Sequence, residues 1–246
     1  MLTVNIDKSC AIAIGTQQRL NNQTEELNIM VMNDNLENVN SIKYLGITID
    51  TNLNWNQHVN NLCLKLSPKI ELLRKLKHKL PTEQLITIYT SIIQPHFDYC
   101  LSVWGFTSKT NLLLLQRLQN RAARIITGKY DWNLSARNIV FELGWMNIRQ
   151  RIDYFITLLT FKALNGLTPA YISDYLHVQQ SSYNIRNANG VHLVVPRANL
   201  EVFKRSFSYN APQLWNRLPL DIQQATSVDL FKSKYKKLLM TNDTPS

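Results

Sequence analysis

The chain has 246 residues, of which 45% are hydrophobic, so it can bury a sizeable core and wholesale disorder is excluded. No run of about 18 apolar residues occurs, so no membrane-spanning helix is expected. The formal net charge is +10, and it is uneven: residues 1–62 carry −3, residues 63–130 carry +8, residues 131–180 are neutral and residues 181–246 carry +5. This clustering favours a polyanionic partner, although solvated helix faces would give the same composition.

The three cysteines, Cys10, Cys63 and Cys100, lie far apart and have no metal-binding spacing. An odd number of separated cysteines suits a reducing compartment inside the cell, either the nucleus or the cytoplasm. The first residues do not form a signal peptide, because no basic leader precedes a long apolar stretch. They read as the middle of a fold, so we expect that the beginning of the natural protein is missing.

Alternating apolar residues in the first 50 positions predict three strands, over Cys10–Thr16, Leu27–Asp34 and Ser41–Asp50. The segments between them are rich in Asn, Gln and Asp, as turns are. In the third strand, alternation would place Leu45 with Ile47 and Ile49 on one face, opposite Tyr44 and Gly46. A glycine inside a strand often marks a close approach to the backbone, so we expect something to approach Gly46.

From Trp55 onward the hydrophobic period is helical. The first helix contains Pro68, which either kinks the helix or restarts it. Further helices are expected over residues 82–93, 109–127, 134–143, 148–164, 169–176 and 228–240. Residues 178–200 are polar and rich in turn formers, and they are the best candidate for a linker or an irregular excursion.

The helix over residues 109–127 carries the sharpest physical signal. At 100° per residue, Arg117, Arg121 and Arg124 fall within about 60° of one another, opposite an apolar face. Guanidinium groups bind phosphates in a bidentate manner and keep their charge. The stripe therefore indicates a nucleic-acid contact, and the alternative is the basic outer face of an ordinary amphipathic helix.

The first long helix adds further basic side chains, which are scattered around its axis. Four of them are candidates for phosphate contacts: Lys65, Lys69, Arg74 and Lys75. Because they do not share one face, they would provide a positive field more than a defined surface.

Other motifs are weaker. His96 and Asp98 have the spacing of two ligands of an iron site, with His177 or His192 as a third, but they follow a helix and a proline, and a packing role is favoured. The stretch Gly105–Thr110 lacks the frame of a phosphate-binding loop. The five tryptophans have apolar neighbours and are expected in the core.

The order of motifs resembles the C-terminal part of reverse transcriptases encoded by non-LTR, LINE-type retrotransposons. Seven segments carry the resemblance, and together they cover nearly the whole chain. In chain order they are NIDKSCAIAIGT (5–16), KYLGITIDTNLNW (43–55), LITIYTSIIQPHFDYCLSVWG (85–105), LQRLQNRAARIITG (115–128), LGWMNIRQRIDYF (143–155), LTFKALNGLTPAYISDYL (159–176) and RSFSYNAPQLWNRLP (205–219). The resemblance implies an α+β chain: a small antiparallel sheet that is a remnant of the palm, then a mostly α-helical thumb and tail.

In that family, the segment that KYLGITID resembles helps to hold the 3′ end of the primer. The resemblance therefore implies a primer-grip-like role for Tyr44, Leu45 and Gly46. It also implies three parts: palm strands over residues 1–54, a helical thumb-like bundle over 55–130, and a helical tail over 131–246 with the irregular segment 178–200.

The chain departs from the family in one large respect. The family's chemistry needs carboxylates that hold two divalent metals, including an Asp-Asp pair in a Tyr-x-Asp-Asp turn. This sequence contains no Asp-Asp pair, and its first residue already lies downstream of the expected turn. We therefore expect no catalytic residues, no metal ligands and no cofactor in this chain, and Mg²⁺ would belong to the missing catalytic part.

The leading hypothesis is a truncated reverse-transcriptase-like protein with residual, non-catalytic binding of RNA, DNA or their hybrid through phosphates. The missing polymerase portion is a further candidate partner. The rival is a helical protein-interaction module, or an inert remnant, whose apolar tail around Phe207, Leu214 and Trp215 contacts protein. An independent enzyme is a third alternative, for which no motif argues.

Overall fold

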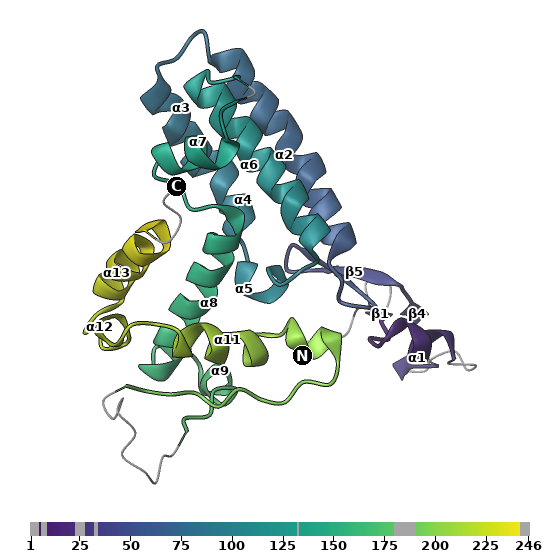
Figure 1. Ribbon diagram of the computed structural model, residues 1–246. Helices are drawn as coiled ribbons and strands as arrows, with labels where there is room; N and C mark the ends of the chain where they lie inside the picture. Colours follow the sequence, from purple (N-terminus) through teal and green to yellow (C-terminus); the bar gives the residue numbers. More distant parts are fainter. Residues whose placement is uncertain are drawn as a thin grey trace. The chain divides into compact units, whose positions relative to one another are not determined.

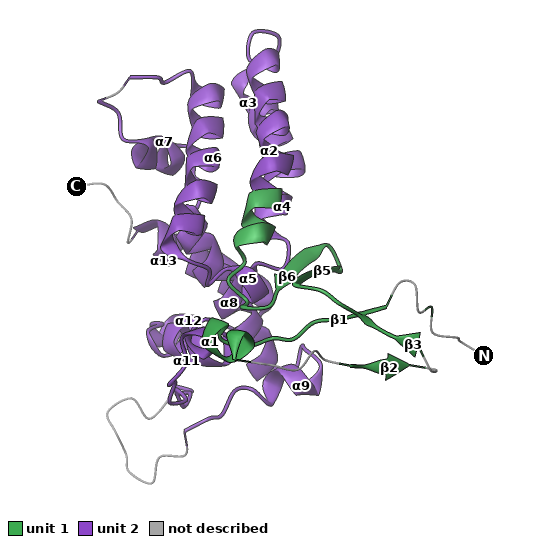
Figure 2. Cartoon of the chain, turned by 90° about the vertical axis from the view of Figure 1, so that its right-hand side faces the viewer, with its two compact units in different colours: residues 1–61 green, residues 62–246 purple. Residues whose placement is uncertain are grey.

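The computed structural model describes residues 5, 9–22, 28–31, 34–131, 133–179 and 190–241. The chain forms two compact units, residues 1–61 and residues 62–246 (Figure 2). Strands occur in the first unit and helices dominate the second, so the α+β class expected from the sequence is confirmed. The division at residues 54 and 130 stays a prediction. Within the described ranges, no helix is both long enough and apolar enough to cross a bilayer.

Among its described residues, the first unit holds three two-stranded sheets instead of one antiparallel sheet. Strand β1 (Cys10–Ala11) pairs in parallel with β4 (Glu37–Asn38), β2 (Met30–Val31) is antiparallel to β3 (Asp34–Asn35), and β5 (Ser41–Tyr44) is antiparallel to β6 (Ile47–Asp50). A short helix, α1 (Gln17–Asn21), follows β1, and Thr16 caps it. Parts of the expected strand over residues 27–34 lie outside the described residues.

The prediction of a single strand over residues 41–50 is wrong, because this segment is a hairpin. Leu45 and Gly46 form the turn, with φ of 46° and 83°. Positive φ at both central residues is the geometry of the type I′ turns that join tightly paired strands, and glycine adopts it without strain. In the observed register Tyr44 pairs with Ile47, so these two side chains share a face. Gly46 is required by the turn.

Asp50 holds the connection from β6 to the next helix. Its carboxylate accepts hydrogen bonds from the backbone N–H groups of Asn52, Asn54 and Trp55 at 3.1, 3.0 and 2.9 Å. Trp55 has a φ of 65°, so the chain here is in a conformation that needs such support. Helix α2 (Asn56–Leu76) begins at the next residue and continues from the first unit into the second.

The second unit is helical (Figure 1). After α2 come α3 (Thr82–Ile88), the π-helical turn η2 (Tyr89–Ile93), α4 (Gln94–Asp98), α5 (Leu101–Trp104), α6 (Lys109–Thr127), α7 (Ala136–Glu142), α8 (Ile148–Leu164), α9 (Ala170–Ser173), α10 (Glu201–Lys204), α11 (Phe207–Asn216), α12 (Leu220–Gln223) and α13 (Val228–Thr241). Two predicted spans, 109–127 and 148–164, match α6 and α8. Pro68 lies inside α2, which does not end there.

Helix α8 is the centre of the second unit. It contacts α4, α5, α6, α9, α11 and α13. Its buried side chains lie on every side of the helix, which is expected of a helix that other elements surround. At its C-terminal half, the ring of Phe161 stacks on that of Phe231 in α13, with 4.4 Å between centroids.

The segment just before α8 joins it to two other helices. Trp145 stacks on Tyr89 of η2, with ring centroids 3.9 Å apart and an interplanar angle of 11°. The carbonyl oxygen of Met146 accepts a hydrogen bond from Gln119 Nε2 of α6 at 2.9 Å. Because Tyr89 and Gln119 are completely buried, these contacts fix the start of α8 within the core.

The first turn of α8 adds a capping box, in which Asn147 and Gln150 satisfy each other's backbone N–H groups. Gln116 Oε1 accepts from the Ile148 N–H at 2.9 Å, and Gln150 Nε2 donates to the Leu239 carbonyl of α13 at 2.7 Å. The stretch LGWMNIRQRIDYF, which resembles a family motif, is therefore the junction of the helical unit.

One ion pair is buried at this junction. Arg151 Nε donates to Asp98 Oδ1 at 2.6 Å, and a second nitrogen of the same guanidinium contacts Oδ2. The two side chains are 6% and 19% exposed. Burial raises the pKa of the Asp98 carboxyl, and Arg151 offsets part of that rise. Such a pair is costly to break, because the remaining charge would stay buried without a countercharge.

Side chains of α11 hold the described end of the irregular segment. Residues 180–189 lie outside the described part, and on either side Val178 and Leu193 form an isolated antiparallel bridge. The side chain of Asn216 accepts from the Leu193 N–H at 2.9 Å and donates to the Leu193 carbonyl at 2.8 Å. Trp215 Nε1 donates to the Val191 carbonyl at 2.8 Å.

Replacing Asp98 with Asn is predicted to cost about 3–5 kcal/mol of unfolding free energy, because Arg151 would remain buried without a countercharge. Urea unfolding measures this change. Asp229→Asn is the matched control, since it breaks the more exposed pair with Lys232 and is expected to cost less than about 1 kcal/mol. Equal losses in the two variants would contradict the structural role of the Asp98–Arg151 pair.

The first unit is predicted to lose stability in acid through His58. The backbone N–H of Thr48 donates to His58 Nδ1 at 3.3 Å, which requires an unprotonated nitrogen, and burial lowers the pKa of His58 below 6.5. The stabilisation is therefore complete above pH 6.5 and is lost as the pH falls through the lowered pKa. Thermal unfolding from pH 8 to pH 5 should show a smaller decline in His58→Gln than in the wild type.

Candidate nucleic-acid interface

Helix α6 presents the arginine stripe because both of its ends and one face are fixed. The Ser108 side chain caps the start by accepting from the Asn111 N–H, and Gly128, with a φ of 71°, ends the helix. The buried residues of α6 lie on the side opposite to the stripe, as expected: Leu115, Gln119, Ala122, Ala123, Ile125 and Ile126. The three arginines therefore point away from the core of the second unit, and each has a different environment.

Arg117 is exposed. Among the residues that the structure describes, it has no hydrogen-bond or ion-pair partner. Its guanidinium donors are therefore available to an external anion.

Arg121 is paired across to the neighbouring helix. Its guanidinium contacts Glu71 Oε1 of α2, and Arg74 Nε lies 3.6 Å from Glu71 Oε2. One carboxylate thus lies between two guanidinium groups from different helices. All three side chains are between 39% and 53% exposed, so this cluster is at the surface.

Arg124 binds the loop that follows α6. One guanidinium nitrogen donates to the carbonyls of Lys129 and Asp131 at 3.3 and 3.2 Å, and another donates to the Leu134 carbonyl at 2.8 Å. These contacts give Arg124 a structural role that the sequence did not suggest. Contact between Arg124 and phosphate stays a prediction.

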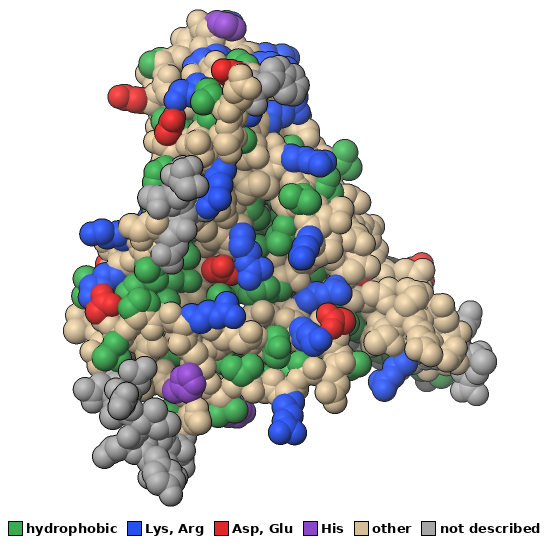
Figure 3. Space-filling view, in the orientation of Figure 1, with side chains coloured by type: hydrophobic (Ala, Val, Ile, Leu, Met, Phe, Trp, Pro, Cys, Tyr) green, Lys and Arg blue, Asp and Glu red, His purple; other side chains and the backbone are tan. Residues whose placement is uncertain are grey.

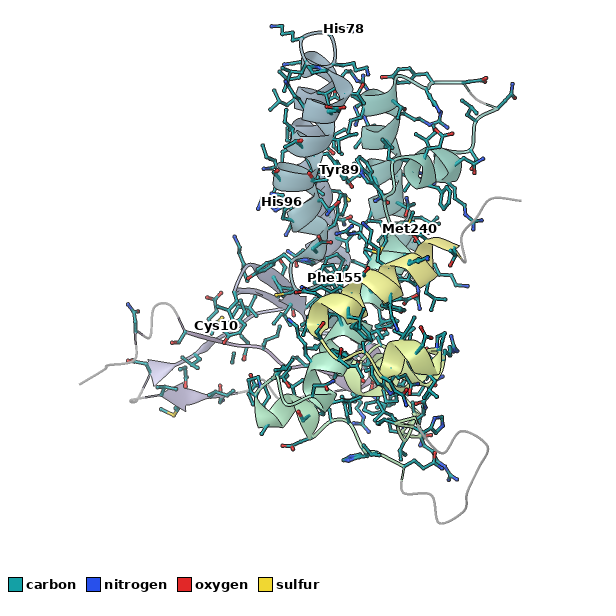
Figure 4. All side chains as sticks on the ribbon, turned by 90° about the vertical axis from the view of Figure 1, so that its left-hand side faces the viewer. Cys10, His78, Tyr89, His96, Phe155 and Met240 are labelled. Atoms are coloured by element: carbon teal, nitrogen blue, oxygen red, sulfur yellow. The ribbon has the colours of Figure 1, made fainter. Side chains whose placement is uncertain are left out.

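Lys65 and Lys69 lie on another side of α2, next to α4. Both are close enough to His96 to lower the pKa of its imidazole, an effect that adds to the larger one of partial burial. Figure 4 shows His96 on the outer side of the helices, whereas Tyr89 lies between them. His96, for which the sequence favoured a packing role over a metal site, therefore lies beside two cations, Lys65 and Lys69.

The helical geometry separates the predicted cations of α2 into two groups. Lys65 and Arg74 are nine residues apart, so they lie on opposite sides of the helix. Group A contains Lys65, Lys69 and His96. Group B contains Arg74, Arg117 and Arg121. Lys75 is exposed on the outward face between them. Figure 3 likewise shows Lys and Arg side chains spread over the visible face and not gathered in a single patch.

The primer-grip-like residues lie at the tip of the β5–β6 hairpin in the first unit. Tyr44 and Leu45 are 60% and 71% exposed, and Gly46 is also exposed. The turn thus presents an aromatic ring and an aliphatic side chain to solvent on a backbone that the hairpin holds. The primer-grip-like role that the resemblance implies for these three residues stays a prediction.

The other candidates do not form a site. Asp98 is held by Arg151, and no group of three or more His, Cys, Asp or Glu side chains within the described ranges could hold a metal. Trp55, Trp104, Trp145 and Trp215 are buried, so they cannot stack on bases, and Trp132 lies outside the described residues. The alternative prediction of a protein-contact surface around Phe207, Leu214 and Trp215 is wrong for Trp215. This side chain is 1% exposed, because it packs against α13 and donates a hydrogen bond to the Val191 carbonyl.

Comparison with curated proteins finds relatives over part of the chain. The probable RNA-directed DNA polymerase from transposon X-element of Drosophila melanogaster is 33% identical over 92 residues, which are 36% of this chain and 10% of that protein. The RNA-directed DNA polymerase from mobile element jockey of Drosophila melanogaster is 33% identical over 104 residues, 41% of this chain and 11% of that protein. Its counterpart from Drosophila funebris is 28% identical over 120 residues, 48% of this chain and 13% of that protein.

The chain thus spans about a tenth of the length of the curated relatives that it matches. No protein-family model matches it. No solved structure matches it.

Replacing Arg124 with Gln is predicted to loosen the loop that follows α6, because it removes the two guanidinium nitrogens that bind the carbonyls of this loop. We expect a loss of about 1–2 kcal/mol of unfolding free energy, and faster cleavage by trypsin after Lys129 in the native protein. Arg117→Gln removes the same charge from a side chain without a described partner and should leave the cleavage rate unchanged. Identical rates in the two variants would argue against the clamp.

Proposed function

We propose that this chain, which contains a region related to the RNA-directed DNA polymerases of non-LTR retrotransposons, binds the RNA–DNA duplex of a primer and template without catalysing synthesis. The chain lacks an Asp-Asp pair, and the described residues include no cluster of metal-ligating side chains. The described residues of this chain therefore do not fit a site for a pair of divalent metals. In this proposal Mg²⁺ would be held by a separate catalytic part, and no chemical step is assigned to this chain.

The observation that supports the proposal most is the placement of groups A and B on opposite sides of α2. An α-helix with its side chains is about 10–12 Å across. Two cationic rows at such a separation can reach two phosphate backbones, which a duplex offers and a single strand does not. The outward face between the rows carries the exposed side chains of Leu64 and Leu72 and of Lys75, and these can lie against sugars.

The same geometry argues for binding with little base preference. Sequence is read mainly by hydrogen bonds to base edges, whereas contacts with phosphate and sugar position the protein. The four described tryptophans are buried and the candidate side chains are cationic. A shape-dependent, salt-sensitive interaction with the duplex backbone therefore follows from the proposal.

The hairpin tip would supply a further contact. In this proposal Tyr44 and Leu45 pack against the end of the primer, and Gly46 lets the backbone turn there. This role rests on the family resemblance together with the exposure of the tip.

Binding of another protein is the second candidate function. It is favoured by Leu167, Tyr171 and Tyr175, which are 58%, 65% and 56% exposed around α9. A patch of this kind in the second unit could contact the polymerase portion of a longer protein. Such binding would resist salt, whereas binding to phosphates would not.

Fluorescence anisotropy with a labelled RNA–DNA hybrid tests the proposed function. Affinity should fall steeply with salt, with a slope of log K against log[salt] down to about −5 if six cations neutralise phosphates. The variants Arg117→Glu with Arg121→Glu, and Lys65→Glu with Lys69→Glu, should each weaken binding at least about tenfold at low salt.

Lys236→Glu with Lys237→Glu on α13 is the matched control, because it makes the same charge change at exposed positions in the tail. An equal loss of affinity in the control would mean that the net charge of the protein, and not the position of these cations, determines binding. Unchanged binding in both interface variants would overturn the proposal, provided that circular dichroism shows them folded.

A further inference from the structure

Glu71 is an unusual residue in its surroundings. It is the sole acidic residue in the sequences of α2 and α6, which together contain eight lysines and arginines. Its carboxylate contacts Arg121 through Oε1 and approaches Arg74 through Oε2. The residue therefore pairs with two of the three guanidiniums of group B, Arg121 of α6 and Arg74 of α2.

The fold depends only weakly on this contact. The Glu71 side chain is 39% exposed and that of Arg121 is 40% exposed, and an exposed ion pair contributes at most about 1 kcal/mol to stability. The two helices have a second link, because Lys77, the residue that follows α2, donates through Nζ to the Ile126 carbonyl near the end of α6. A carboxylate that is weakly needed by the fold can be exchanged for another anion.

A phosphate diester is a suitable competitor. It carries one negative charge and acceptor oxygens that match the fork of a guanidinium, as the carboxylate does. Both anions cannot use the same N–H donors of Arg121 at once. A phosphate that binds there must displace Glu71, and it also meets the repulsion of the nearby carboxylate.

We infer that Glu71 is an internal competitor for nucleic-acid phosphates, which occupies Arg121 and Arg74 in the free protein and so limits affinity at group B. The inference rests on the proposed function and identifies Glu71 as a residue that regulates the affinity for nucleic acid. Arg117, which no described residue occupies, would then make the first contact, and Arg121 and Arg74 would follow when Glu71 is displaced.

Binding of the RNA–DNA hybrid to Glu71→Gln tests the inference. We expect affinity about three- to tenfold tighter than that of the wild type at low salt, with a steeper salt dependence because Arg121 and Arg74 become available. Glu201→Gln is the matched control: it makes the same charge change and also releases a cation, Lys204, from an exposed pair three residues away. The gain should be absent there, and it should be largely lost when Arg121→Gln is added to Glu71→Gln.

Weaker binding by Glu71→Gln would overturn the inference, because it would mean that Glu71 positions the guanidiniums. An equal gain in Glu201→Gln, or a gain that persists without Arg121, would overturn it as well. If the wild type binds and Glu71→Gln matches it, this inference alone fails. If neither protein binds the hybrid, the proposed function fails as well.

A measurement on the wild type guards against a variant that does not fold. The side-chain Nε–H resonance of Arg121 should move when the hybrid is added, as its partner changes from carboxylate to phosphate. The Nε–H of Arg151, held in the buried pair with Asp98, is the internal control and should not move. An unmoved Arg121 resonance at saturating hybrid would overturn the inference.

Discussion

The helical unit depends on how α8 begins. Within seven residues, the chain from Trp145 to Arg151 stacks on η2, forms two hydrogen bonds with α6 and one with α13, and neutralises Asp98 of α4. Each contact satisfies a polar group that would otherwise be buried without a partner, or covers an aromatic ring. Because one short segment meets so many requirements, its sequence is constrained well beyond hydrophobicity.

The arginines of this protein show how context divides one side chain among several roles. Arg151 is buried and contributes to the core, Arg124 closes a loop by binding carbonyls, Arg121 is exposed but occupied, and Arg117 is available. All four carry the same charge, and three of them lie on the same face of α6. What distinguishes them is the set of acceptors that the rest of the chain brings within reach, so a count of cations overestimates the surface that a polyanion can use.

The sequence predicted best those elements whose signals are local. Helix α6 is bounded by Ser108 and Gly128, and α8 by the cap at Asn147, so their spans could be read directly. The hairpin at Leu45 and Gly46 was missed because alternation continues through a two-residue turn, and Leu-Gly lacks the usual Asn-Gly signal. The Glu71–Arg121 pair joins residues 50 positions apart, and no periodicity reveals such a contact. The partners of Arg124 are backbone carbonyls, which every sequence contains.

The π-helical turn at Tyr89–Ile93 has a consequence for how this region can change in evolution. A π-helical turn contains an extra residue relative to an α-helix, and each residue turns the chain by about 100°. The turn places Tyr89 against Trp145 and, farther along, Asp98 against Arg151. Deletion of a single residue here would restore regular α-helix but rotate Asp98 away from its partner. Substitutions in this stretch can therefore accumulate one at a time, whereas a change in its length requires compensation across the whole junction.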